Sequence, residues 1–404
     1  MSDTFKKMDA GLMNMTNQRV ILKLIKRHGV ISRSEMANIT GLTPPSIKRI
    51  VDELIDIDLV EDIGVGSSSG GRPSLLVKFK NENNYIIGID LGATYIRGCL
   101  VDLNAKFISE VQVPTEIENG YDSIIEKVIQ LIQKLSSRKG EGSKIWGVGI
   151  GVAGLVNNKT EILESSPDFG WYHTNLRKEL KNKIDLPFYY DNSTRLMALS
   201  ELSFNNKKNI SNFAVINVGY GIASGLVIDG RLVYGESGFA GELGHICVEP
   251  NSKVKCKCGM YGCLEALASG NRIASIAKKE LENYDSAILK KLCRNNPNEI
   301  TAEIVGIAAK QGDILSIKIY TDIAEYLCRG IGIIANLLNP EAIYIGGGIS
   351  LNGDFFFDLV KKNMSNFLLA PNSNLKILPS SFGEQATSIG AVALILKKVM
   401  NLEL

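Results

Sequence analysis

Residues 85–115 read YIIGIDLGATYIRGCLVDLNAKFISEVQVPT. Their apolar residues fall into three short runs, and turn-forming Gly, Asp and Asn residues separate these runs. The pattern predicts three strands joined by tight turns. Residues 213–235, FAVINVGYGIASGLVIDGRLVYG, repeat the plan with a Gly-x-Gly turn and an Asp-Gly turn. The chain therefore contains two copies of one strand unit.

The repeated unit predicts an α/β chain with two lobes. Helical segments follow each copy, and such a duplication indicates two similar lobes that face a cleft. Glycine-rich turns on both sides of a cleft let backbone N–H groups approach a phosphate chain. Glycine turns between strands are more often only turns, so a nucleotide site does not follow from them alone.

The first 80 residues have a different character, because they carry 12 Lys and Arg against 9 Asp and Glu. Residues 17–28 show apolar positions at helical spacing, and Gly29 is a natural stop. Ser32 and Glu35 form a capping-box pattern that opens a second helix, which closes on Gly41. The apolar stripe of the first helix is predicted at Val20, Ile21, Leu24 and Ile25.

A third helix is predicted to begin at Pro44, with Thr43 as its N-terminal cap. Its apolar stripe faces the core, while Ser46, Lys48 and Arg49 lie on the opposite face. Small polar and basic side chains on a helix that follows a tight turn suit the major groove of DNA. An ordinary solvated helix face is the alternative. The predicted stripe consists of Ile47, Ile50, Val51, Leu54 and Ile55.

The segment after this helix favours the DNA-binding interpretation. Residues 59–79, LVEDIGVGSSSGGRPSLLVKF, predict two short strands around a Gly/Ser-rich tip, which is the form of a wing. Arg72 in this tip can reach a phosphate or the minor groove. The predicted DNA contacts are Arg33, Thr43, Pro45, Ser46, Lys48, Arg49 and Arg72.

Three of the seven cysteines, Cys256, Cys258 and Cys263, lie shortly after His245. Three thiolates and one imidazole make a closed tetrahedral ligand set of the kind that holds structural zinc. Reduced thiols near a core histidine are the alternative. An odd number of cysteines indicates a reducing compartment rather than a disulfide framework. The remaining cysteines are predicted to be small core residues, namely Cys99, Cys247, Cys293 and Cys328.

No apolar run is long enough to cross a bilayer, and the opening residues MSDTFKKMDA lack an apolar signal segment. We therefore expect a cytoplasmic protein that does not act in a membrane.

Taken together, the winged-helix start, the DLGAT turn at 90–94, GELGH at 241–245 and CKCGMYGCLE at 256–265 resemble the ROK family of sugar kinases and sugar-responsive repressors. The resemblance covers nearly the whole chain, and the cysteine motif is its most specific part. It implies the actin-like, hexokinase-like two-lobed fold of the ribonuclease H type. Because family members with a DNA-binding N-terminus are regulators, it points to the branch of xylose- and N-acetylglucosamine-type repressors.

The resemblance also implies roles for individual residues. It places structural zinc on His245, Cys256, Cys258 and Cys263, which leaves no open position for a reacting water. It places the sugar contacts at Gly154, Asn157, Asn192, Glu242, His245 and Glu265. Carboxylates, amides and an imidazole suit a polyhydroxylated ligand, because each hydroxyl both donates and accepts hydrogen bonds. Leu155 departs from the polar residue that some members use.

Catalysis is not expected. Ser193 stands where the family kinases carry the aspartate that serves as general base, and a serine hydroxyl is not a base at neutral pH. The turn at 219–225, GYGIASG, has lost a threonine and two glycines relative to the kinase pattern. An ATP-dependent sugar kinase is the alternative, and a scaffold protein that binds neither DNA nor sugar is the third class.

We therefore expect a sugar-responsive repressor with a winged helix-turn-helix domain at 1–80 and a sugar-binding domain at 81–404. Lobe one should span about 85–192 plus a C-terminal helix at about 386–404, and lobe two about 193–385. The expected partners are operator DNA, a sugar or sugar derivative and further copies in a homodimer or homotetramer, because one recognition helix reads few base pairs. No recognisable motif specifies the sugar or the direction of its effect.

Overall fold

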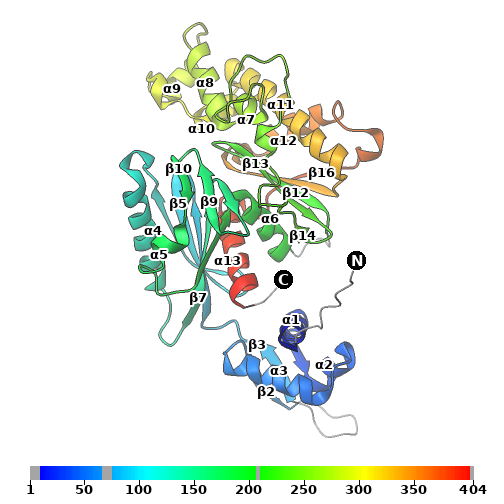
Figure 1. The fold of residues 1–404 in the computed structure, drawn as a ribbon. Coiled ribbons are helices and arrows are strands. Elements are labelled where there is room, and N and C mark those ends of the chain that lie inside the picture. Colours follow the sequence, from blue (N-terminus) through cyan, green and yellow to red (C-terminus); the bar gives the residue numbers. More distant parts are fainter. Residues whose placement is uncertain (1–9, 66–74, 206–209, 401–404) are drawn as a thin grey trace, which may run out of the picture.

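The computed structural model of the chain describes residues 10–65, 75–205 and 210–400. The first part of the chain comprises three helices and a small antiparallel sheet of strand order β1-β3-β2 (Figure 1). Its elements are α1 (Ala10–His28), β1 (Val30–Ser32), α2 (Arg33–Thr40), α3 (Pro44–Asp56), β2 (Val60–Val65) and β3 (Leu75–Phe79). This arrangement is the predicted winged helix-turn-helix.

The helix signals of this unit act as predicted. Ser32 accepts a hydrogen bond from the Glu35 backbone N–H at 3.1 Å, and Thr43 caps α3 in the same way through Ser46. Gly41 ends α2 with a φ of 70°, which a glycine adopts without strain. The predicted stripe of α1 was wrong at one position, because Val20 is 43% exposed and Leu22 is buried instead. The wing tip at 66–74, with Arg72, lies outside the described residues.

A five-stranded sheet of order β11-β7-β4-β5-β6 forms lobe one, and the first strand unit supplies three of its strands. α4 packs against β4, β5 and β6. A three-stranded sheet of β8, β9 and β10 follows β7 in the chain. The elements are β4 (Asn84–Leu91), β5 (Tyr95–Asp102), β6 (Phe107–Pro114), η1 (Ile117–Asn119), α4 (Gly120–Ser136), β7 (Lys144–Val152), β8 (Leu155–Asn157), β9 (Ile162–Ser166), β10 (Trp171–Thr174), α5 (Leu176–Leu180) and β11 (Phe188–Asn192).

A second five-stranded sheet, of order β14-β13-β12-β15-β16, contains the other strand unit and forms lobe two. Its strands are β12 (Phe213–Val218), β13 (Ile222–Ile228), β14 (Arg231–Leu232), β15 (Ala342–Gly346) and β16 (Lys376–Pro379). Its helices are η2 (Leu243–His245), α7 (Leu264–Ala268), α8 (Gly270–Glu280), α9 (Ala287–Leu292), η3 (Pro297–Glu299), α10 (Ala302–Lys310), α11 (Ile314–Leu338), η4 (Gly348–Asn352), α12 (Asp354–Met364), η5 (Ala370–Asn372) and η6 (Gly383–Gln385).

Two helices lie between the sheets and hold the lobes together (Figure 1). α13 (Ala386–Val399) packs on β4, β7 and β11 of the first sheet, and α6 (Ser193–Phe204) packs along α13 and on β12 and β13 of the second. At Gly390 an added Cβ would lie 1.8 Å from the Leu196 carbonyl oxygen, so the backbones of α13 and α6 are in contact. Within the described ranges, no helix has the length and apolar character needed to cross a membrane.

Candidate metal centre and sugar site

The predicted zinc ligands come together in the loop between η2 and α7. The donor atoms of His245, Cys256, Cys258 and Cys263 all lie within 4.8 Å of one another. The Sγ atoms of Cys258 and Cys263 are 3.7 Å apart, and the Cys256 Sγ is 3.6 Å from Nδ1 of His245. A tetrahedral ion with Zn–S bonds of about 2.3 Å requires donor separations of about 3.8 Å, so the residues fit zinc. Nδ1 faces the thiols, which leaves Nε2 of His245 for another partner.

One of the other cysteines differs from its prediction. Cys99, Cys293 and Cys328 are fully buried, as small core residues should be. Cys247 is exposed, and its backbone forms an isolated bridge with that of Cys263 in the segment from Glu242 to Glu265, which we call the metal loop. Its place two residues after His245 was the signal for this proximity, and its apolar neighbours Ile246 and Val248 wrongly suggested burial.

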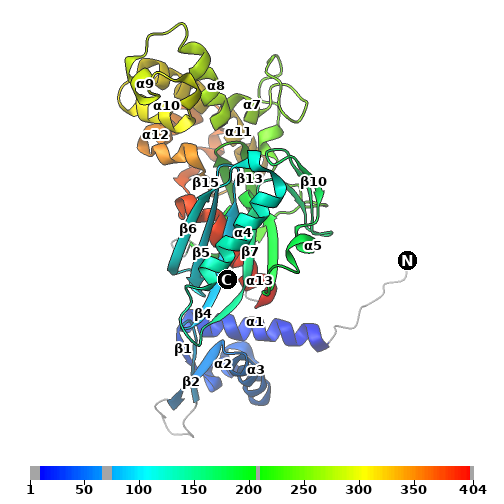
Figure 2. The same cartoon turned by 90° about the vertical axis from the view of Figure 1, so that its left-hand side faces the viewer.

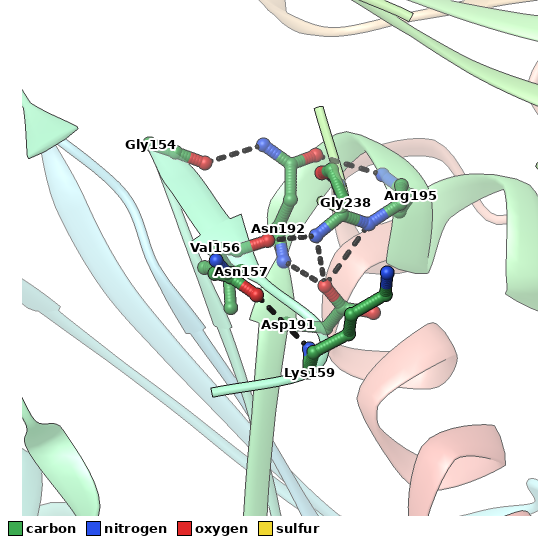
Figure 3. Close-up of polar contacts among 8 residues, drawn as sticks. All are labelled: Gly154, Val156, Asn157, Lys159, Asp191, Asn192, Arg195 and Gly238. Atoms are coloured by element: carbon green, nitrogen blue, oxygen red, sulfur yellow. Dashed lines mark hydrogen bonds and ion pairs between the residues drawn. The ribbon is translucent and has the colours of Figure 1, made fainter. Parts of the chain in front are cut away.

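The predicted sugar residues Gly154 and Asn192 are joined directly (Figure 3). Asn192 ends β11 and caps α6, because its side-chain oxygen accepts the Arg195 backbone N–H at 3.0 Å. Its Nδ2 donates to the Gly154 carbonyl at 2.8 Å. Gly154 has a φ of 143°, a backbone conformation that disfavours any other residue. The amide of Asn192 therefore fixes the turn after β7 against the start of α6.

Glu242, His245 and Glu265 are neighbours on the lobe-two side. Burial raises the pKa of Glu242, while the electrostatic influence of the neighbouring His245 and Arg195 side chains opposes this shift. Glu265 accepts the Ile222 backbone N–H through Oε2 at 3.0 Å, which fixes its carboxylate at the start of β13. Two carboxylates and an imidazole thus lie close together within the metal loop.

Asn157 is held in a turn rather than against the other predicted contacts. Its Oδ1 accepts the backbone N–H groups of Lys159 and Thr160, and its Nδ2 lies 3.4 Å from Glu164. Glu164 also contacts His173 Nδ1 at 2.9 Å. The Glu164–His173 pair was not predicted, since its members lie on different strands.

The most buried charged pair of the site, Asp191 and Arg195, was also missed as a unit. The Arg195 side chain is 2% exposed and the Asp191 side chain 7%. Arg195 donates to Asp191 through Nε and Nη2, to the Val156 carbonyl through Nη2 at 3.0 Å, and to the Gly238 carbonyl through Nη1 (Figure 3). It therefore joins β8 of lobe one to the loop that precedes Glu242. The i,i+4 spacing of Asp191 and Arg195 was the available signal.

The residues that depart from the kinase pattern lie at the start of α6 and in the turn between β12 and β13. Ser193 is buried as the first residue of α6, and the Asp191 carboxylate is taken up by Arg195. In the turn between β12 and β13, Tyr220 is 46% exposed and lies beneath the Lys257 ammonium, 4.8 Å from its ring centroid. The Ser224 hydroxyl donates to the Gly241 carbonyl. None of these groups supplies a free base beside Asn192.

Apart from Arg72, which lies outside the described residues, the predicted DNA-contacting residues lie on or beside α3, and several have partners within the unit. Arg33 pairs with Asp52 at 2.7 Å and with Asp62 at 3.1 Å. Lys48 and Arg49 pair along the helix with Asp52 and Glu53. The Thr43 and Ser46 hydroxyls lie 2.9 Å apart at the N-terminus of α3, and Pro45 is exposed between them. Arg33 thus braces α2 against α3 and the wing strand β2.

A surface groove of about 600 Å³ lies elsewhere, between the end of α4 and the start of β7. None of the predicted sugar contacts lines it.

Comparisons with known proteins separate the two parts of the chain. A winged helix-turn-helix DNA-binding family matches residues 16–61, and the ROK family matches residues 86–398. The xylose repressor of Caldicellulosiruptor bescii is 30% identical over 393 residues, which cover 96% of this chain and 98% of the relative. The glucokinase of Thermotoga maritima is also 30% identical, but its match covers 78% of this chain and 98% of the enzyme.

Solved structures divide in the same way. A ROK family transcriptional regulator, a homologue of the E. coli MLC protein, matches with a TM-score of 0.80 and 28% identity over 96% of this chain and 99% of its own. A ROK glucokinase from Streptomyces griseus, solved with glucose and AMPPNP, matches with a TM-score of 0.70 and 28% identity over 77% of this chain and 98% of its own. The predicted two-lobed fold is confirmed, and the chain belongs to the ROK family, with a winged helix-turn-helix in front of the family domain.

Proposed function

We propose that this protein is a sugar-responsive transcriptional repressor of carbohydrate catabolism genes. Residues 1–80 bind operator DNA, and the two lobes of residues 81–404 bind a sugar between them. The observation that carries the proposal is that one chain contains both units. A xylose repressor aligns with 96% of this chain, which includes both of them. Xylose is accordingly the first sugar to test.

The proposed sugar contacts are Gly154, Asn157, Asn192, Glu242, His245 and Glu265. The proposed metal is structural zinc on His245 and the three cysteines, and it would hold the loop that presents Glu242 and Glu265. Support comes from the donor separations and from Nε2 of His245, which the thiols leave available. The protein acts in the cytoplasm as a homodimer or homotetramer, since specific operators pair two half-sites.

The test is a mobility-shift assay on full-length protein with duplexes enriched from random DNA by the protein itself. We expect specific binding, a shift in affinity with xylose or another sugar of a neutral and phosphorylated panel, and weaker binding by Arg49→Ala. Absence of specific DNA binding, or the same affinity with every sugar, contradicts the proposal.

Sugar phosphorylation is the second candidate, because the matched glucokinases share the family domain. Ser193 at the base position and the Asp191–Arg195 pair argue against it. We expect no sugar-dependent ATP turnover from the parent protein and little from Ser193→Asp, since the 219–225 turn is also altered. Robust turnover by the parent would establish the kinase instead.

A further inference from the structure

The DNA-binding unit and the sugar-binding body share one buried apolar cluster. α1, α2, α3 and the small sheet contribute one side, and β4, β5, β7 and α13 contribute the other. Figure 2 shows the DNA-binding unit below the body. Residues on the body side are Ile86, Cys99, Val101, Leu103, Trp146, Ile389, Val392, Ile395, Leu396 and Met400. These side chains place the unit against the body, although among the described residues no element of the unit packs extensively on an element of the body.

Lys26 of α1 lies at this junction and has no carboxylate within hydrogen-bonding distance among the interactions of the described residues. Its Nζ donates to the Leu103 carbonyl at 3.1 Å and lies 5.7 Å from the Phe79 ring and 5.9 Å from the Phe204 ring. Burial lowers its pKa to about 8. A simple apolar junction would favour an apolar side chain here, so the ammonium group needs another explanation.

The partners of Lys26 come from different parts of the body. Leu103 follows β5 in the lobe-one sheet, whereas Phe204 ends α6, which packs on β12 and β13 of lobe two. Phe79 belongs to the DNA-binding unit itself. Any movement of α6 relative to the first sheet must therefore change the surroundings of the Lys26 ammonium.

α6 also begins at the proposed sugar site. Asn192 caps its N-terminus, and Arg195 lies in its first turn. Its 12 residues span roughly 18 Å at about 1.5 Å per residue, and every residue from Ser193 to Glu201 is buried. The backbone contacts at Gly390 and at Gly225, where an added Cβ would lie 2.7 Å from the Thr194 carbonyl oxygen, leave no space for α6 to bend independently.

We propose that α6 transmits changes at the sugar site to the DNA-binding unit. The contacts of Lys26 with Phe204 and with the Leu103 carbonyl would connect α6 and lobe one to α1. This inference rests on the proposed repressor function. A ligand changes the DNA affinity only through a difference between two states, and the Lys26 contacts are the place where the two states differ for α1. Lys26 is neither among the proposed sugar contacts nor among the proposed DNA contacts, so its proposed role is coupling.

The test compares Lys26→Met with the parent as full-length proteins. Methionine keeps an unbranched apolar stem and removes only the ammonium. Lys23→Met is the matched control, because Lys23 is an exposed lysine on the same helix. Each protein is measured for operator affinity with and without saturating sugar, using xylose or the panel sugar to which the parent responds. Sugar affinity is measured separately by calorimetry.

We expect the ratio of operator affinities with and without sugar to fall at least about fivefold toward 1 in Lys26→Met, while sugar affinity stays within about threefold. Lys23→Met should keep the parental ratio. Phe204→Leu, which keeps an apolar side chain, should reproduce the loss from the other side of the contact and covers the case in which Lys26→Met fails to fold.

An unchanged ratio in both Lys26→Met and Phe204→Leu overturns the coupling proposal. A lowered ratio that is matched by an equal loss of sugar affinity also overturns it, because Lys26 would then act on sugar binding. A parent protein that responds to no sugar refutes the proposed function itself, which distinguishes that failure from failure of the coupling.

Discussion

Arg195 is the most buried charged side chain of the site. Its hydrogen-bond partners determine its position. Taking a guanidinium and a carboxylate out of water costs several kcal/mol each, and the cost is recovered only when their hydrogen bonds are satisfied. Asp191 and the carbonyl groups of Val156 and Gly238 satisfy Arg195 from three elements. The pair therefore specifies how β8 and the loop before Glu242 lie relative to α6.

The first prediction concerns this pair. Asp191→Asn should lower the free energy of unfolding by about 3–5 kcal/mol, because it leaves the Arg195 charge buried without its partner. The double variant Asp191→Asn, Arg195→Gln should be less destabilised than the sum of its single variants, by at least about 1 kcal/mol. Urea unfolding measures all of these differences.

The control for this cycle is the exposed Lys159–Glu236 pair, which also connects the two sides of the site. The variants Lys159→Gln and Glu236→Gln should leave the free energy of unfolding nearly unchanged, because surrounding water and salt screen exposed pairs. Additive effects in the Asp191 and Arg195 cycle would mean that the buried pair does not act as a unit.

At the scale of elements, the metal loop and α3 each depend on a few side chains for their shape. The loop from Glu242 to Glu265 contains a short 3-10 helix and isolated bridges. Backbone hydrogen bonds hold its turns, for example from Cys256 to Met260 and from Gly262 to Val254. The segment has no long helix or strand, so a bound ion that joins four of its side chains would order it further.

The second prediction tests the metal loop. Cys258→Ala should lower bound zinc from about one ion per chain, because three ligands remain. Sugar affinity should fall by more than the roughly 10–100-fold typical of a lost outer-shell partner, since the whole loop loses order. Metal analysis and calorimetry on the variant and its parent provide the measurement. Cys293→Ala is a control for the loss of a thiol away from the loop. A parent without zinc, or undiminished sugar affinity in Cys258→Ala, would contradict this role.

The third prediction concerns α3. Hydrogen bonds from Lys48 and Arg33 hold the pKa of Asp52 below its ordinary value, so this carboxylate neutralises part of the proposed DNA face. Asp52→Asn should tighten binding to unrelated DNA several-fold and make the salt dependence steeper, because more positive charge becomes available to phosphates. Salt titrations of DNA affinity measure both effects.

Asp56→Asn removes the same charge from the last turn of α3 and serves as the control. An equal change in both variants would show a general charge effect rather than release of Lys48 and Arg33.

The elements differ in how far the sequence could predict them. The caps at Ser32 and Thr43 and both strand units followed from local signals, because turns and caps depend on neighbouring residues. The four-donor cluster also formed as expected. The contacts of Arg195 and the braced position of Arg33 could not be predicted, because each depends on carbonyls or carboxylates that only the tertiary fold brings near.

At the scale of the whole molecule, the two lobes and the DNA-binding unit meet around α6 and α13. α6 begins at Asn192 in the proposed sugar site and ends at Phe204 against the shared apolar cluster, to which α13 contributes residues from Ile389 to Leu396. A repressor needs such a connection, because a sugar that stays about a helix length away can act on DNA only through the packing between them.

The last prediction uses the charge that the molecule keeps at this junction. Burial lowers the pKa of Lys26 from 10.5 to about 8, and the Asp102 carboxylate only partly offsets this effect. Between these two pH values the unfolded chain binds more protons than the folded chain, so the free energy of unfolding rises with pH. Above about pH 10.5 the lysine is neutral in both states, and burying it carries no cost for a charge. As the pH falls through about 8 the buried lysine must be charged, and the free energy of unfolding reaches its lower value.

Lys26→Met has no group to titrate at this position, so thermal unfolding of the parent and of this variant should differ with pH. From pH 7 to pH 10 the parent should gain about 2 °C or more relative to the variant. Titration of other groups affects both proteins alike and cancels in the difference. Lys23→Met should follow the parent across the whole range, because its side chain is already in water. Parallel curves for the parent and Lys26→Met would show that the ammonium is not desolvated at the junction, and that the DNA-binding unit does not pack there in solution as it does in this structure.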